Sequence, residues 1–372
     1  MLLEAHEDFD RDFRGDTVHP SVMEVLDELG LAEGVLALRH SKIHRATFVT
    51  PDGPFVAIDF GRLDTRFPYI TMLPQAQFLA FLVEEAKKFP AFRVVMGARV
   101  EELVEEEGVV RGVRYEADDG WHEVRAQLTV GADGRSSRVR RLSGLDEGML
   151  KTSPPMDVLW FRVPREPTDP EGILARFGRG NAAVMLDRLD QWQVAFIILK
   201  GTYKEVRAAG LDKLRASVSE TLPEYADRFA HLTEWKQISM LSVESSRVRR
   251  WHRPGLLLVG DAAHVMSPVG GVGINYAIQD AVVAANHLTR PLLASDVREE
   301  HLAAVQRERE WPTKVIQWIQ TQAQRNILAA ALRSDRPFGL PWPLRLLLRT
   351  PFLRDIPARV IAFGVRRVHV RQ

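Results

Sequence analysis

The residues best suited to chemistry lie in the segment GLLLVGDAAHVMSPVGGVGINYAIQDA, at positions 255–281. Its apolar residues 256–259 predict a strand that is buried on both faces. Asp261 follows this strand at the edge where open α/β sheets bind ligands, and its carboxylate can accept hydrogen bonds from sugar or polyol hydroxyls. Pro268 and nearby glycines then predict a tight loop whose backbone N–H groups can approach a flat ligand closely. These glycines are Gly270, Gly271 and Gly273.

We expect a helix after this loop, because apolar residues recur there on one helical face: Ile274, Ala277, Ile278, Ala281, Val282, Ala285 and Leu288. The free N–H groups at the start of such a helix favour an anionic or electron-rich ligand. The loop alone leaves this interpretation open, since Tyr276 occupies the third glycine position of a GxGxxG motif and many glycine loops are only turns. His264 is either a packed loop residue or a functional group, and the pattern favours the former.

A second turn of the same kind lies earlier in the chain, within LTVGADGRSSRVR at positions 128–140. Here Asp133 and Gly134 follow another apolar strand-like run. The two turns are far apart in sequence, at positions 128–140 and 255–281. The residues between them are mostly strand-like. Because strands of one parallel sheet end at a common edge, the two turns are predicted to meet at a single ligand.

Together the two turns resemble the GADGxxSxVR and GDAAHxxxPxxGxGxN motifs of the FAD-dependent aromatic hydroxylases, the para-hydroxybenzoate hydroxylase type of flavoprotein monooxygenase. The resemblance extends over most of residues 1–290 and is weakest over 151–245. It implies an FAD enzyme that uses NAD(P)H as a transient reductant and O₂ as oxidant. Its substrate would be an aromatic or other hydrophobic small molecule, hydroxylated through a flavin C4a-hydroperoxide. The sequence identifies no catalytic side chain.

The resemblance also implies which residues hold the cofactor. Asp133 and Arg138 would contact both FAD and NAD(P)H, Asp261 would hold the ribitol, and Asn275 would lie near the pyrimidine edge of the ring. Glu4 would accept the adenosine ribose hydroxyls. The implied cofactor-binding set is Glu4, Arg14, Gln75, Val100, Asp133, Gly134, Arg138, Gly260, Asp261, Pro268, Gly271, Val272, Gly273, Ile274 and Asn275.

One expected segment is missing from the printed sequence. In the family, a strand, a GxGxxG turn and a helix precede the residue that matches Glu4, and that helix receives the FAD pyrophosphate. We expect that the printed chain is a fragment or begins at a misplaced start, because a sheet without its central strand leaves backbone polar groups unpaired. The alternative is a protein that has lost a principal phosphate contact.

The predicted fold is α/β, with a discontinuous Rossmann-like FAD-binding domain, a β-sheet substrate domain and a helical C-terminal tail. The FAD-binding domain would comprise residues 1–40, 72–150 and 246–330, the substrate domain 41–71 and 151–245, and the tail 331–372. Helices are expected at 17–38, 75–89 and 203–221, and Gly30 is expected to end the first of them. Strands are expected at 46–60, 94–130 and 156–200, with a hairpin turn at 118–120.

The bulk composition excludes several classes of protein. The 372 residues carry a net charge of +1, which argues against nucleic-acid binding, and they include no cysteine. No Asp, Glu and His cluster has metal-ligand spacing, so no metal site is expected. The start of the chain does not read as a signal peptide, and no apolar run reaches the roughly 18 residues of a membrane span. We therefore expect a cytoplasmic protein.

The C-terminal residues 333–372 contain nine arginines and two aspartates among apolar residues. This pattern is typical of a basic amphipathic surface that makes peripheral contact with an anionic membrane. It is also typical of helices that pack on the protein's own core with their arginines in solvent, and the many apolar residues favour this second interpretation.

Three functional interpretations compete. The first is the monooxygenase described above, whose substrate side would include side chains such as His44, Tyr69, Trp160 and Arg162, although packing or surface roles are more common for such residues. The second is a reductase or halogenase of the same fold, and the absence of a GxWxWxIP-like signature disfavours the halogenase. The third is a truncated or degenerate paralogue that does not hold FAD.

Overall fold

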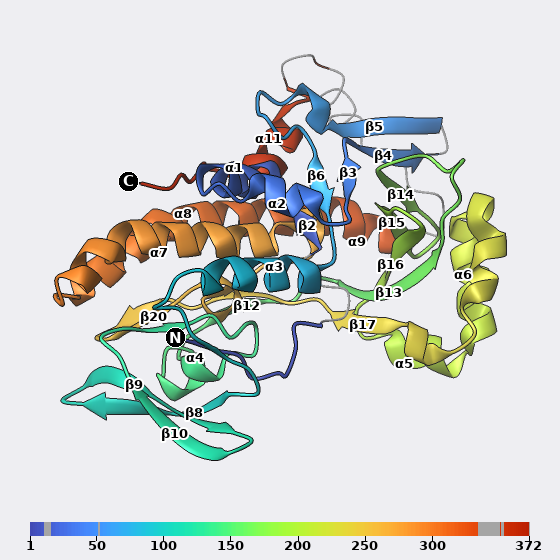
Figure 1. The fold of residues 1–372 in the computed structure, drawn as a ribbon. Helices are drawn as coiled ribbons and strands as arrows, with labels where there is room; N and C mark the ends of the chain where they lie inside the picture. The colour runs from blue at the N-terminus through green and yellow to red at the C-terminus, as the bar shows by residue number, and fades with distance from the viewer. Residues whose placement is uncertain (11–15, 51–52, 334–349, 351–352, 372) are drawn as a thin grey trace.

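The computed structural model describes residues 1–10, 16–50, 53–333, 350 and 353–371 (Figure 1). Two long helices, α7 (Gly273–Leu293) and α8 (Glu299–Ala323), lie side by side across the middle of the molecule. A large sheet lies at the right-hand end of these helices, and small sheets lie above and below them (Figure 1). The predicted α/β class is confirmed.

The large sheet has seven strands, and all neighbouring pairs are antiparallel except β14 and β4. Its order is β17 (Ser239–Ser242), β13 (Met156–Pro164), β16 (Gln191–Leu199), β15 (Ala182–Arg188), β14 (Ile173–Phe177), β4 (Arg45–Thr50) and β5 (Gly53–Asp59). The strands predicted over 46–60 and 156–200 therefore form one sheet, although they are far apart in sequence.

The two faces of this sheet pack against different parts of the chain, because successive side chains of a strand point to opposite faces. Leu159 and Phe161 of β13 pack on the outer face with helix α6 (Leu211–Thr221). Val158 and Trp160 share the inner face with the turn η6 (Gln324–Leu328), which continues α8. Since alternation continues along β13, the inner face also carries Arg162.

Parallel pairing occurs in the small sheets. β11 (Thr129–Gly131) pairs in parallel with β20 (Leu256–Leu258), and β20 pairs with β19 (His252–Arg253). β1 (Leu2–Leu3) pairs in parallel with β7 (Val94–Val95) as a separate two-stranded sheet. With one neighbouring strand on the described part of the chain, β1 leaves Leu2 42% exposed. The strand β1 is thus less buried than its apolar sequence suggests.

The remaining strands form three small sheets. The hairpin predicted at 118–120 is confirmed, because β9 and β10 pair across it. The strands are β8 (Arg99–Glu106), β9 (Val109–Ala117) and β10 (Gly120–Arg125) in one sheet, β2 (Thr17–Val18), β6 (Ile70–Met72) and β3 (Ser41–Ile43) in another, and β12 (Leu150–Thr152), β18 (Ser245–Arg247) and β21 (His264–Val265) in the third.

Two predicted helices are each divided by a glycine. The helix expected at 17–38 is α1 (Pro20–Glu28) and α2 (Ala32–Ala37), with Gly30 between them at φ +72°. The helix expected at 203–221 is α5 (Tyr203–Ala208) and α6, divided at Gly210 with φ +93°. A left-handed residue cannot continue a right-handed helix. Gly30 therefore ends the first helix as expected, although a second helix follows it, and the prediction of a single helix over 203–221 was wrong. The helix expected at 75–89 is a single element, α3 (Gln75–Lys87).

The described part of the C-terminal tail packs on the protein's own core. Helix α11 (Ile356–Phe363) buries Ala358, Ala362 and Phe363 against Phe60 and its neighbours. The short helix α9 (Ala329–Leu332) precedes residues 334–349, which lie outside the described residues. Membrane contact through the tail stays a prediction.

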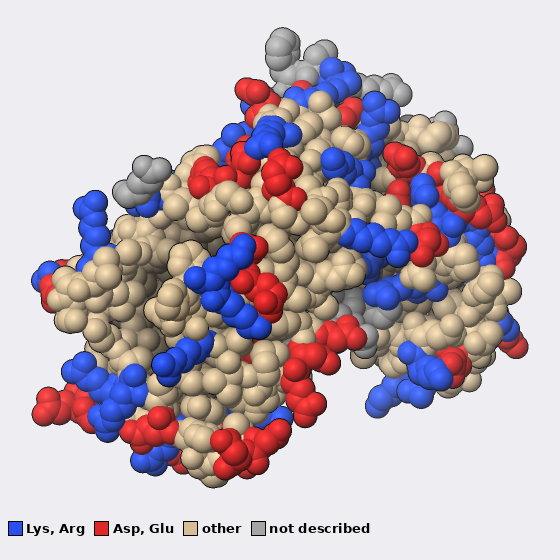
Figure 2. Space-filling view, in the orientation of Figure 1, with Lys and Arg blue, Asp and Glu red and all other residues tan. Residues whose placement is uncertain are grey.

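The surface carries both signs of charge. Figure 2 shows Lys and Arg side chains interspersed with Asp and Glu, so neither sign dominates that face. Among the described helices, none combines the length and apolar content needed to cross a membrane.

Candidate active site

The two acidic turns lie at one edge of one sheet. Gly131 pairs with Leu258, and the N–H of Val259 donates to the carbonyl of Gly131 at 3.0 Å. Asp133 and Asp261 follow these residues closely, and the two strands are parallel. Both acids therefore leave the sheet at its carboxyl edge, which is where ligands bind in open α/β sheets.

Arg140 joins the two turns. Its side chain is buried, and Nη1 donates to the carbonyl of Ala262 at 2.8 Å while Nη2 donates to that of Arg135 at 2.8 Å. One guanidinium thus binds backbone from both motifs. Sequence reasoning missed this residue, although it is the final position of the GADGxxSxVR motif.

Asp133 also shapes its own turn. Its carboxylate accepts hydrogen bonds from the N–H groups of Arg138 and Val139, at 2.6 and 3.0 Å, at the start of the short helix α4 (Arg138–Leu142). The guanidinium of Arg138 forms an ion pair with Glu101. These contacts explain why an acid is needed in the turn, and contact of both residues with FAD stays a prediction.

Gly260 brings the strand end of β20 against α7. Its φ is +57°, and a Cβ atom there would lie 2.9 Å from the Cβ of Ala277. Its N–H donates to Asp280 Oδ2 at 3.0 Å. A larger residue would push the turn η4 (Gly260–Ala262), and with it Asp261, away from the helix.

The glycine loop is fastened to β2. Gly271 has φ +64°, and a Cβ atom there would lie 2.9 Å from Thr17 Oγ1, which donates to the Gly271 carbonyl at 3.1 Å. Asn275 Nδ2 donates to the carbonyls of Thr17 and Gly271, and Asn275 Oδ1 accepts from the N–H of His19 at 2.8 Å. The buried side chain of Asn275 therefore faces β2 and the glycine loop.

Helix α7 begins at this loop without a side-chain cap. Its N-cap residue is Val272, and Pro268 begins the short turn η5 (Val269–Gly271) before it. Gly273 is the first helical residue, and Ile274 packs on the cluster beside β2. The first N–H groups of a helix have no partner within the helix, so this end suits an electron-rich ring edge or an anion.

A buried ion network lies beneath the loop. Asp280 is fully buried and contacts His264 Nε2 at 2.6 Å and Arg309 Nε at 2.7 Å. Burial acts to raise the pKa of Asp280, but His264 and Arg309 outweigh it and hold that pKa below its usual value. His264 is thus packed in a buried polar network around Asp280. Sequence reasoning missed Asp280, whose signal is an acid within an otherwise apolar helix.

The other residues of the predicted cofactor-binding set lie on separate parts of the chain. The N–H of Gln75, at the start of α3, donates to Asp16 Oδ1 at 3.1 Å. Val100 packs on the cluster around Leu256 and Leu258. Glu4 directly follows β1 of the separate β1–β7 sheet, and its N–H donates to the Val95 carbonyl at 2.9 Å. Arg14 lies outside the described residues.

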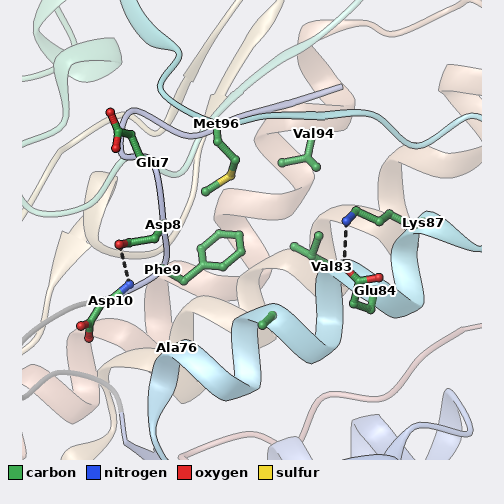
Figure 3. Close-up of a pocket in the computed structure, with 11 residues that line it drawn as sticks. Glu7, Asp8, Phe9, Asp10, Ala76, Val83, Glu84, Lys87, Val94 and Met96 are labelled. Atoms are coloured by element: carbon green, nitrogen blue, oxygen red, sulfur yellow. Dashed lines mark hydrogen bonds and ion pairs between the residues drawn. The ribbon is translucent and has the colours of Figure 1, made fainter.

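A cavity of about 430 Å³ lies between the N-terminal segment and α3 (Figure 3). Phe9, Val83 and Met96 form part of its apolar wall, and Glu7 and Asp8 lie at its edge. None of the predicted cofactor residues lines it. Carboxylates repel phosphate, so we do not assign it to FAD. Among the described residues, no cluster of three or more His, Asp or Glu side chains is arranged to hold a metal ion.

The parallel strands, acidic turns, glycine loop and separate large sheet define the class of FAD-dependent oxidoreductases. The chain belongs to the family whose model is described as "FAD binding domain", because that model matches residues 1–319. The resemblance inferred from the two motifs, the assignment as an enzyme and FAD as cofactor are confirmed. The uncapped start of α7 fits the ring edge of FAD, because its first backbone N–H groups have no partner within the helix.

Several relatives support this assignment. The 6-methylpretetramide 4-monooxygenase of Streptomyces rimosus is 34% identical over 377 residues, which cover 100% of this chain and 88% of that protein. The anhydrotetracycline monooxygenase of Streptomyces rimosus is 30% identical over 71% of this chain and 52% of its own length.

Solved structures agree. The anhydrotetracycline hydroxylase OxyS of Streptomyces rimosus has a TM-score of 0.73 at 25% identity, covering 100% of this chain and 72% of that chain. PqsL of Pseudomonas aeruginosa has a TM-score of 0.74 over 90% of this chain and 89% of that chain. At 21% identity PqsL shows the fold alone, as does the flavin-dependent halogenase CmlS, with a TM-score of 0.73 at 20% identity.

Proposed function

We propose that this chain hydroxylates a fused-ring aromatic compound of the polyketide type, with NAD(P)H as transient reductant and O₂ as oxidant. The observation that carries this proposal is the meeting of the two acidic turns at one sheet edge. The glycine loop that follows the second turn packs through Val269 on the inner-face cluster of the large sheet. The chain's similarity to a 6-methylpretetramide 4-monooxygenase over its whole length supports the substrate class.

The chain's own residues would hold the cofactor in defined roles. Asp261 would bind the ribityl hydroxyls, and the backbone N–H groups at 271–275 would contact the ring edge next to Pro268. Asp133, Arg138, Gln75 and the other members of the predicted set would complete the site, within the domain division predicted from the sequence. When bound, FAD supplies electron transfer from NAD(P)H and the activation of O₂.

A polar cluster on the inner face of the large sheet would orient the substrate. Arg188 Nη1 donates to Asp16 Oδ2 at 2.7 Å and to Gln193 Oε1 at 2.6 Å. The register places Arg162 opposite Gln193. Asp16 directly precedes Thr17, which binds the glycine loop. The cluster therefore connects the large sheet to the proposed cofactor loop. A substrate would lie between the sheet and this loop.

The charges of this cluster suit hydroxyl groups on an aromatic ring. Burial raises the pKa of Asp16, although Arg188 and the N–H of Gln75 act to lower it. Burial likewise lowers the pKa of Arg188. A phenol or enol oxygen can accept from the guanidinium groups, so the cluster would fix which ring carbon faces the cofactor.

The test uses the purified, FAD-loaded protein with fused-ring and single-ring phenols. We expect fused-ring phenols to accelerate NAD(P)H oxidation and to yield a product that carries one ¹⁸O atom from ¹⁸O₂. Acceleration without ¹⁸O, together with a saturated product, would indicate a reductase. No acceleration by any phenol would refute the proposed substrate class.

A further inference from the structure

Three glutamines of α8 and its continuation form a row on one helical face. Gln317, Gln320 and Gln324 are 7%, 3% and 3% exposed. Their spacing of three and four residues brings them onto the same side of the helix. This row, which we call the glutamine row, faces the segment 265–269 that leads into the glycine loop.

Each member of the glutamine row donates to this segment. Gln317 Nε2 donates to the Val265 carbonyl at 3.1 Å and to the Ser246 carbonyl at 3.0 Å. Gln320 Nε2 donates to the Ser267 carbonyl at 3.0 Å and to the Val269 carbonyl at 2.8 Å. Gln324 Nε2 donates to the hydroxyl of Ser267.

These hydrogen bonds satisfy backbone carbonyls of a segment that lies largely outside helices and strands. Buried carbonyls need donors, and residues 266–268 lie between β21 and the turn η5 rather than within a strand. The amide of Gln320 uses both of its N–H groups on two carbonyls that flank Pro268. The carbonyls therefore point toward α8, and the loop is held in one orientation.

The row ends where α8 changes geometry. At Gln324 the helix widens into the π-helical turn η6, and such turns are frequently found at functional sites. Glutamine is also a neutral donor, so it fixes the backbone without placing a charge beside the loop. A lysine or arginine would satisfy the same carbonyls but would add a positive charge there.

We infer that the glutamine row positions the cofactor loop, so that Gln320 sets the placement of Pro268 and of the N–H groups at 271–275 against the ring. The inference rests on the proposed FAD site. Gln320 is a positioning residue, because it acts on the cofactor through the loop and contacts no reacting atom.

The test compares Gln320→Glu and Gln320→Met with the same changes at Gln322. A carboxylate at 320 is an acceptor that faces two carbonyls, whereas methionine only removes the donors. Gln322 lies on the same helix, and its Oε1 accepts from Asn326 Nδ2 at 3.2 Å. The measurements are the FAD dissociation constant, the visible spectrum of the bound flavin and its midpoint potential, made on the full-length protein.

We expect Q320E to raise the FAD dissociation constant about tenfold or more and to shift the flavin spectrum, since two hydrogen bonds are lost. Q320M should act in the same direction with a smaller effect, and both Gln322 variants should match the parent protein. Should Q320E fail to fold, Q320M and Gln324→Met, which removes the donor to Ser267, decide the question.

Folded Gln320 variants whose FAD affinity, spectrum and potential equal those of the Gln322 variants would overturn the inference. Failure of the parent protein to bind FAD would instead overturn the proposed function. The two failures are therefore distinguishable.

Discussion

Asn275 directs its side chain toward β2 and the glycine loop. Its amide joins the backbone of Thr17, His19 and Gly271, and it is 2% exposed. The motif predicts that Asn275 contacts the cofactor, and the structure shows that its side chain also holds the glycine loop in place. The spacing of a motif gives the position of a residue but not its side-chain rotamer, so the sequence predicted the location of Asn275 and not this role.

Replacing Asn275 by alanine should destabilise the protein by about 2–3 kcal/mol, because buried hydrogen-bonding groups on β2 and the loop lose their partner. Chemical denaturation measures the effect. The exposed Asn326→Ala change should alter the free energy of unfolding by no more than about 0.5 kcal/mol. Equal effects of the two changes would show that the Asn275 contacts contribute little.

His19 is a buried histidine beside the same loop. Its Nδ1–H donates to the Ile361 carbonyl at 2.7 Å, and burial lowers its pKa to about 4 despite this bond. In the unfolded chain a histidine has a pKa near 6.5. Below that value the unfolded chain therefore binds a proton that the folded protein does not, which favours unfolding.

Stability should fall as the pH falls from about 6.5 to about 4, by up to about 3 kcal/mol from His19 alone. His19→Gln should flatten this part of the stability profile, measured by denaturation at several pH values. His231→Gln, at an exposed histidine, should leave the slope unchanged. An unchanged slope in the His19 variant would contradict the assignment of a neutral buried imidazole.

At the scale of elements, the loop before α7 depends on close backbone approach. The sequence predicted a strand, an acidic turn, a glycine loop and a helix here, and β20 and α7 confirm the strand and the helix. The contact with β2 could not be predicted, because it joins residues that are far apart in sequence. The division of the helix at Gly210 was missed because helical periodicity continues across a glycine whose φ is set by packing.

Gly271→Ala and Gly270→Ala separate backbone strain from close approach. Both glycines have positive φ, but a Cβ atom at 271 would lie 2.9 Å from Thr17 Oγ1, whereas the nearest atom at 270 is 3.6 Å away. G270A should cost about 1–2 kcal/mol from the backbone alone, and G271A a further 1–3 kcal/mol. Thermal and chemical unfolding measure the difference, and equal costs would contradict the close contact.

At the scale of the whole molecule, a pair of side chains connects the large sheet to the proposed cofactor region. Asp16 and Arg188 lie far apart in sequence and form an ion pair in which each side chain is 10% exposed. The discontinuous organisation was expected from two motifs on either side of a strand-rich region. The pairing itself could not be predicted, because strand order and register depend on long-range packing.

Arg188→Met should weaken productive substrate binding, since it removes donors to Asp16 and Gln193 at the sheet. We expect KM for a fused-ring phenol to rise about tenfold, with FAD affinity unchanged. Arg179→Met is the matched control, because Arg179 is 65% exposed and pairs with Glu220 on the surface. An unaltered KM in the Arg188 variant would show that the polar cluster does not belong to the substrate site.

The most direct test is a crystal structure of the protein bound to FAD. We predict one FAD at the carboxyl edge of β11 and β20, with a ribityl hydroxyl within hydrogen-bonding distance of Asp261 and the ring edge beside the backbone N–H groups at 271–275. An FAD bound elsewhere, with the turns at Asp133 and Asp261 both free of it, would contradict the account.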